Sequence, residues 1–171
     1  MKKSNLVLLI CLIIVLFIGY FTYQNLNKQK ITINDSCITD ITQKVKNIEM
    51  NISKYSMATK DIIGKTTEGG QQTDYIFEGK KVLIKQIFFG ETGKSEVNYY
   101  LENNKVYYFK KINTEYLLPI SEDSSGKIKN IDTKEFYLDN NQNICSWYLN
   151  QKLQLNDQDT KDLTQYLLSS L

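Results

Sequence analysis

The hydrophobic pattern divides the chain into three stretches. Residues 6–21 form a continuous apolar run without a charged side chain, and the next two residues extend it to 18. As a helix, 18 residues span about 27 Å, close to the roughly 30 Å of a bilayer's hydrocarbon core. Residues 24–34 are polar and rich in Asn, Gln and Lys, as is typical of a tether. We therefore expect a transmembrane anchor at residues 1–23, a tether at 24–34 and an exported domain at 35–171.

A cleaved signal peptide and a lipid anchor are the alternatives to a retained transmembrane segment. The apolar region of a signal peptide has about 7–15 residues and ends in small residues, whereas residues 19–23 are mostly aromatic. Lipidation at Cys11 would need a small residue before it, where Ile10 stands. Two lysines precede the apolar run, although two more lie in the tether. These features favour a single-pass protein of the cell membrane that contacts the lipid bilayer through residues 6–23, with a cytoplasmic N-terminus and the main domain outside.

After the tether the apolar residues recur at helical spacing, three and four residues apart. They are Ile38, Ile41, Val45, Ile48, Ile52 and Tyr55. This stripe predicts an amphipathic helix over residues 35–57, with Asp35 or Ser36 as its N-cap. The stripe could pair with another chain as a coiled coil, but it is shorter than three heptads, so packing on a sheet is favoured.

From residue 59 to residue 150 the pattern is typical of β-strands. The predicted strands are Gln72–Phe77, Lys81–Phe89, Ser95–Leu101, Lys105–Ile112, Lys134–Leu138 and Ile144–Leu149. Most breaks are short and carry Gly, Asn or Asp, which indicates antiparallel hairpins; residues 113–132 are predicted as a long exposed hairpin loop. Residues 157–171 predict a short terminal helix. The predicted fold class is α+β: an antiparallel β-meander of about six or seven strands with a long N-terminal and a short C-terminal helix, behind the transmembrane helix.

The composition removes several kinds of chemistry. The chain has 21 basic residues, all lysine, against 19 acids, and no histidine. Without histidine there is no Ser-His-Asp or Cys-His catalytic arrangement and no zinc site with histidine ligands. The two lysines before the apolar run account for the net charge of +2, so we expect no nucleic-acid partner. We expect no catalytic site, no metal site and no cofactor.

Two motifs carry possible chemistry. Residues 90–95, Gly-Glu-Thr-Gly-Lys-Ser, resemble the end of a phosphate-binding loop, but a strand pattern follows where that loop needs a helix, so a hairpin turn is predicted. Glu68, beside two glycines, could form a hydrolytic carboxylate pair with Glu91, Glu96 or Asp74. This hydrolase acting on an envelope substrate is an alternative to a non-enzymatic protein.

The two cysteines of the exported part are Cys37, at the start of the helix, and Cys145, on the strand face predicted to hold Trp147 and Leu149. They are either a disulfide or two buried thiols. The 12 tyrosines either follow strand propensity or offer a surface suited to binding proteins or sugars.

Residues 67–70 (Thr-Glu-Gly-Gly), 89–94 (Phe-Gly-Glu-Thr-Gly-Lys) and 99–101 (Tyr-Tyr-Leu), followed by an aromatic strand with Trp147, resemble a group of uncharacterised bacterial envelope proteins. These are small secreted or lipid-anchored β-meander proteins of Bacteroidetes, and the hairpin unit is also similar to MORN-type repeats. The resemblance implies a fold and a compartment but no activity. Together with the composition it favours a non-enzymatic binding or accessory module, inhibitor- or immunity-like, with a protein partner. A structural anchor subunit of a larger complex is a further alternative.

Overall fold

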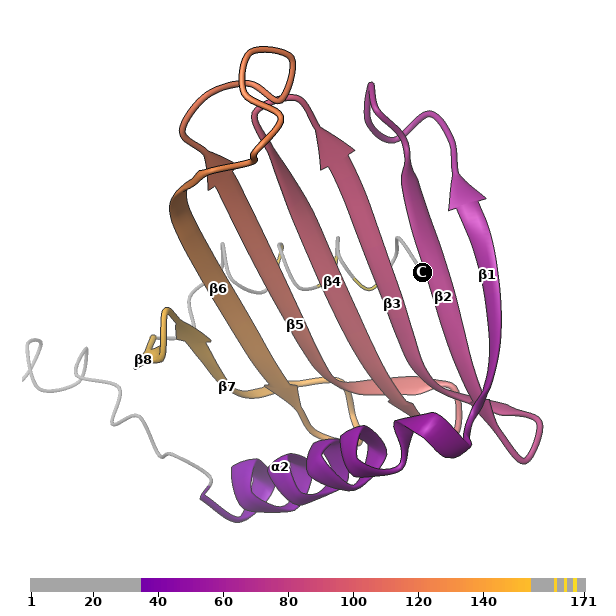
Figure 1. Ribbon diagram of the computed structural model, residues 1–171. Helices are drawn as coiled ribbons and strands as arrows, with labels where there is room; N and C mark the ends of the chain where they lie inside the picture. The colour runs from indigo at the N-terminus through magenta and orange to yellow at the C-terminus, as the bar shows by residue number, and fades with distance from the viewer. Residues whose placement is uncertain (1–34, 155–161, 163–164, 166–167, 169–171) are drawn as a thin grey trace, which may run out of the picture. The chain divides into compact units, whose positions relative to one another are not determined.

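A computed structural model describes residues 35–154 together with residues 162, 165 and 168. Residues 35–154 form one α-helix, a 3₁₀ turn and eight strands. These are α2 (Asp35–Met50), η1 (Ile52–Lys54), β1 (Ser56–Ile62), β2 (Gly70–Phe77), β3 (Lys80–Gly90), β4 (Gly93–Glu102), β5 (Lys105–Tyr116), β6 (Ile128–Leu138), β7 (Ile144–Leu149) and β8 (Lys152–Leu153). All eight strands belong to one antiparallel sheet in chain order (Figure 1).

The antiparallel sheet is confirmed, but the predicted α+β fold class is wrong. The described chain is mostly one sheet of eight strands, rather than six or seven, with a single α-helix. The helix predicted over residues 35–57 ends at Met50. Of the predicted C-terminal helix at 157–171 the structure describes only residues 162, 165 and 168, and each of them is helical.

Two local causes explain the shorter helix. The side-chain amide of Asn51 donates a hydrogen bond to the carbonyl of Asn47 at 2.8 Å, which satisfies one of the carbonyls left unpaired at the helix end. The chain then turns, and β1 pairs along its whole length with β2, from Ser56 opposite Ile76 to Ile62 opposite Gly70. The start of β1 at Ser56 therefore ends the helix early, and the last stripe residues, Ile52 and Tyr55, lie in and just after η1.

The predictions for the first 34 residues, an anchor at 1–23 and a tether at 24–34, lie outside the described residues. Among the residues that the structure does describe, no helix is long and apolar enough to cross a bilayer. The transmembrane helix of the predicted fold class is therefore not part of the described fold.

The helix α2 covers one face of the sheet, here called the helix face. Ile41, only 4% exposed, joins Leu83, Tyr100 and Tyr108 in a buried cluster, and other residues of the helix stripe pack against it. The preference for packing on a sheet is thus confirmed. Tyrosines buried here and on the opposite face, Tyr99, Tyr100, Tyr107 and Tyr108, are core residues and offer no exposed aromatic surface.

A disulfide joins Cys37 of α2 to Cys145 of β7, 108 residues along the chain. The prediction that Cys145 shares the face of Trp147 is wrong, because the β6–β7 register shifts at this point: Tyr137 lies opposite Ser146, and Leu138 opposite Ile144. A bulge of this kind puts two residues opposite one and re-aims a side chain. Cys145 therefore reaches the helix face.

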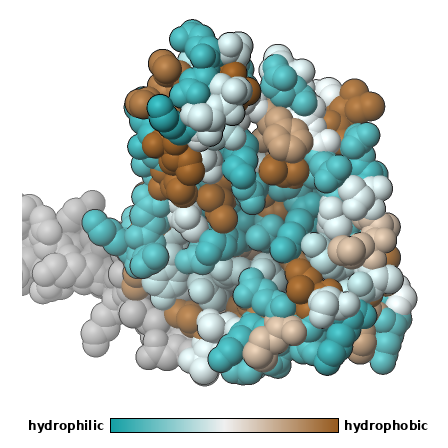
Figure 2. All heavy atoms as spheres, in the orientation of Figure 1, coloured by the Kyte–Doolittle hydropathy of each residue, from teal (hydrophilic) through white to brown (hydrophobic). Residues whose placement is uncertain are grey.

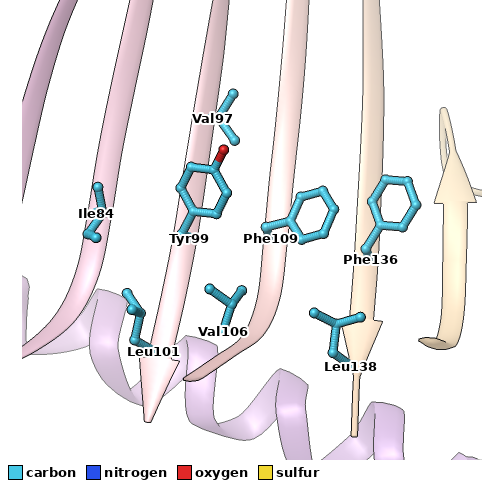
Figure 3. Packing of buried hydrophobic residues seen from close by; sticks show 8 residues of the cluster. All are labelled: Ile84, Val97, Tyr99, Leu101, Val106, Phe109, Phe136 and Leu138. Carbon is cyan, nitrogen blue, oxygen red and sulfur yellow. The ribbon is translucent and has the colours of Figure 1, made fainter. Parts of the chain in front are cut away.

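The opposite face, here called the far face, holds the second buried cluster. Ile84, Tyr99, Phe109 and Phe136 are opposite one another on β3 to β6, and Figure 3 shows them with α2 behind the strands. The rings of Phe109 and Phe136 stack at 4.5 Å, and that of Phe136 stacks on Trp147 at 5.2 Å. The side chain of Leu168 packs against this cluster.

Hairpin turns connect the strands. The φ angles of Asn103 and Asn104 are +51° and +63°, the left-handed conformation that a two-residue turn between twisted strands needs. The phosphate-loop look-alike at residues 90–95 is confirmed as a hairpin between β3 and β4. The predicted loop at 113–132 is too long, because pairing of β5 with β6 leaves only residues 117–127 outside the strands.

Candidate functional site

The acids singled out in the sequence do not meet in one site. Glu68 lies exposed in the β1–β2 connection and lines a pocket of about 480 Å³, which Glu91 does not line. Glu91 is in the β3–β4 turn and accepts a hydrogen bond from the Ser121 hydroxyl. Asp74 is on the far face in an ion pair with Lys81, and Glu96 pairs with a lysine on its own strand. The four carboxylates therefore have four separate environments.

A polar pocket lies at the end of the sheet where β3 joins β4 and β5 joins β6. It has a volume of about 350 Å³, and its lining includes Phe88, Ser95, Asn113 and Asp132. These four residues stand opposite one another on β3, β4, β5 and β6, on the far face. The strands β4, β5 and β6 each supply one hydrogen-bonding side chain, and β3 supplies an aromatic ring.

Hydrogen bonds hold the polar groups of this pocket in place. The Ser95 hydroxyl donates to the side-chain oxygen of Asn113 at 2.9 Å. Asp132 accepts from the amides of Asn130 at 3.1 Å and Asn150 at 3.0 Å. The amide nitrogen of Asn113 makes no hydrogen bond to a described residue, so it is available to a ligand.

The sequence carried a signal for this pocket. On the far face β5 runs from Phe109 through Lys111 to Asn113, and β6 runs from Phe136 through Lys134 to Asp132. Every second residue thus changes from apolar to polar along both strands. The sequence of residues 113–132 predicts a loop, and that prediction hides this change of character on one face.

An apolar surface, here called the apolar rim, lies at the same end of the sheet as the pocket. It comprises Leu117, Leu118, Ile120, Ile128 and Ile131, each between 39% and 57% exposed. Figure 2 shows hydrophobic side chains gathered at this end of the sheet.

Backbone hydrogen bonds fix the loop that carries the rim. The amide of Ile120 donates to the carbonyl of Glu91 at 2.9 Å, and that of Leu117 donates to Lys127 at 2.7 Å. The two lysines beside the rim, Lys127 and Lys129, are paired with acids at 3.8 and 2.7 Å. The rim is therefore a fixed apolar surface without excess charge.

A series of buried polar side chains, joined by hydrogen bonds, lies on the far face of β2 and β3. The amide of Gln86 donates to Gln72 at 2.9 Å, the amide of Gln72 donates to Asp74 at 2.7 Å, and Lys81 pairs with Asp74 at 2.6 Å. Burial alone would raise the pKa of Asp74, but the hydrogen bonds from Lys81 and Gln72 lower it below its ordinary value. These side chains satisfy one another's hydrogen bonds, and the series ends at Lys81, whose side chain is 47% exposed.

The described residues contain no group of three His, Cys, Asp or Glu side chains arranged to hold a metal ion. Comparison of the chain with protein-family models, with curated proteins and with solved structures gave no match. The resemblance to envelope β-meander proteins therefore stays a prediction.

Proposed function

We propose that this chain is a membrane-anchored, non-enzymatic binding module of the bacterial envelope that docks a partner protein through the apolar rim. The observation that carries the proposal is the concentration of exposed apolar side chains: five of the ten exposed large hydrophobics of the described residues belong to the rim. Exposed apolar side chains gathered in one place mark interaction sites.

Two features of the rim support a protein partner. Its loop is held by backbone hydrogen bonds to the β3–β4 turn, so little conformational entropy is lost on docking. The lysines beside it are paired with Asp123 and Glu115, which leaves no surplus positive charge to attract anionic lipid headgroups. In this proposal the apolar segment at residues 6–23 anchors the chain, and the sheet lies outside the cell membrane.

The test is a crosslinking pull-down from native membranes with the full-length chain as bait. We expect the partner captured by the wild-type chain to be lost with Leu117→Ser/Leu118→Ser, because burying a leucine contributes about 2 kcal/mol and two substitutions weaken binding by at least about tenfold. The matched control is Met57→Ser/Ile63→Ser, which removes exposed side chains outside the rim, 66% and 91% exposed. Circular dichroism checks that each variant is folded. Equal capture by both variants, or no capture by the wild type, would contradict the proposal.

A further inference from the structure

We infer that Lys111 and Lys134, on the far face, form a binding site for an anion of the carboxylate or phosphate type. The two residues lie directly opposite each other on β5 and β6. Residues in this relation have Cβ atoms about 4.5–5.5 Å apart on the same face. Two ammonium groups can therefore reach the two oxygens of one small anion.

Neither lysine has a partner within the described part of the chain. No hydrogen bond or ion pair joins Lys111 or Lys134 to a described residue, whereas the neighbouring Lys110, on the helix face, pairs with Glu135 at 3.2 Å. The acid nearest along the same face of β6, Asp132, is occupied by two asparagine amides. The positive charge of the pair is thus not neutralised by these residues.

The surroundings of the pair strengthen attraction for an anion. The next residues toward the core on the same face are Phe109 and Phe136, both 0% exposed, and Lys111 is half-buried above them. Burial, together with the charge of Lys134, lowers the pKa of Lys111. A bound anion would offset both effects, because its negative charge stabilises the charged lysines and screens the repulsion between like charges that lie directly opposite each other in a sheet.

A neutral donor extends the site toward the polar pocket. Asn113 lies two residues beyond Lys111 on the same face and has its amide nitrogen unpaired among the described residues. An anion between the lysines would therefore meet two charged donors and one neutral donor. This arrangement is independent of the apolar rim and so does not rest on the proposed function.

The test uses the purified full-length chain in an uncharged detergent at low ionic strength and pH 7. Inorganic phosphate and acetate are titrated separately against sodium chloride of equal ionic strength, and binding is followed as the rise in melting temperature and by two-dimensional NMR. We expect saturable binding of at least one of the two anions. We also expect Lys111→Gln or Lys134→Gln to weaken it at least about tenfold.

The matched control is Lys80→Gln, which removes the same charge from an exposed lysine in the β2–β3 hairpin and should leave the affinity unchanged. Lys111→Arg and Lys134→Arg keep the charge and should retain binding even if a glutamine variant fails to fold. Saturation by phosphate alone would assign the site to phosphate groups, and saturation by acetate as well would include carboxylates.

Three results would overturn the inference. The first is that neither anion binds above the sodium chloride reference, and the second is that Lys80→Gln weakens binding as much as the other variants. The third is that binding occurs only after substitution of two acids outside the described residues, Asp157→Asn/Asp159→Asn, because these acids would then be the ion-pair partners of the two lysines. Unchanged affinity in that double variant supports an external ligand.

Discussion

Removal of the Cys37–Cys145 disulfide should destabilise the folded chain by several kcal/mol. The bond closes a loop of 108 residues. In the chain-entropy treatment a loop of this length restricts the unfolded state by about 4.7 kcal/mol, and measured losses for native disulfides are about 2–5 kcal/mol. We therefore expect a loss of about 3–5 kcal/mol and a fall in melting temperature of about 10 °C.

The comparison is made in a Cys11→Ser background, so that only the bridged pair differs. Full-length Cys11→Ser and Cys11→Ser/Cys37→Ala/Cys145→Ala are unfolded with urea in uncharged detergent, and Trp147, the single tryptophan, reports the transition. Because Trp147 stacks on Phe136, its fluorescence follows the far-face cluster. The urea dependence gives the free energy of unfolding of each variant.

Two results would refute this reasoning. One is a difference below about 1 kcal/mol between the two variants, since the bond would then constrain neither state. The other is the titration of two free thiols in the unreduced Cys11→Ser chain, which would show that the bond does not form. Treatment of Cys11→Ser with a reductant is the control, because it should reproduce the loss without changing any side chain.

Two further predictions concern the far face. Phe109→Ala should destabilise the fold by about 3–5 kcal/mol in urea unfolding, because the ring is 0% exposed and stacked on Phe136; a loss below 1 kcal/mol would show that the cluster is loosely packed. Asp74→Asn should reduce stability at pH 7 by about 1–3 kcal/mol, because it weakens the bonds to Lys81 and Gln72. Since the folded pKa of Asp74 is lowered, its contribution is present above about pH 4 and is lost as the pH falls through the folded value. Urea unfolding at pH 7 and pH 3 should therefore show a smaller difference between the two proteins in acid, and an equal difference would count against the ion pair.

The strands that carry strong alternation could be predicted from the sequence, and the two edge strands could not. In β3 to β7 the aromatic and β-branched residues lie in a two-residue period between short polar turns, so local pattern and pairing agree. In β1 nearly all residues are exposed, so its sequence shows no alternation of apolar and polar residues that would predict a strand. The turn before β8 uses Asn150 and Gln151 with positive φ, and glutamine is not a usual residue there.

The sites depended on information that a single sequence does not hold. Lys111 and Lys134 are 23 residues apart, and only the register of β5 against β6 makes them neighbours. The face reached by Cys145 depended on a bulge, which the composition of β7 does not reveal. Pairing register decides both cases, and it arises from the packing of the whole sheet.

The chain-order arrangement of the strands bears on how the protein assembles. Each strand bonds only to its immediate predecessor and successor, so the sheet can lengthen one hairpin at a time and needs few distant encounters. The helix α2 is the exception, because it contacts β5, β6 and β7. During synthesis Cys37 emerges long before Cys145, so the disulfide can form only after β7 is made. Until then the Cys37 thiol is unpaired and can react with wrong partners, and a thiol-exchange catalyst would correct such mispairing once Cys145 is made.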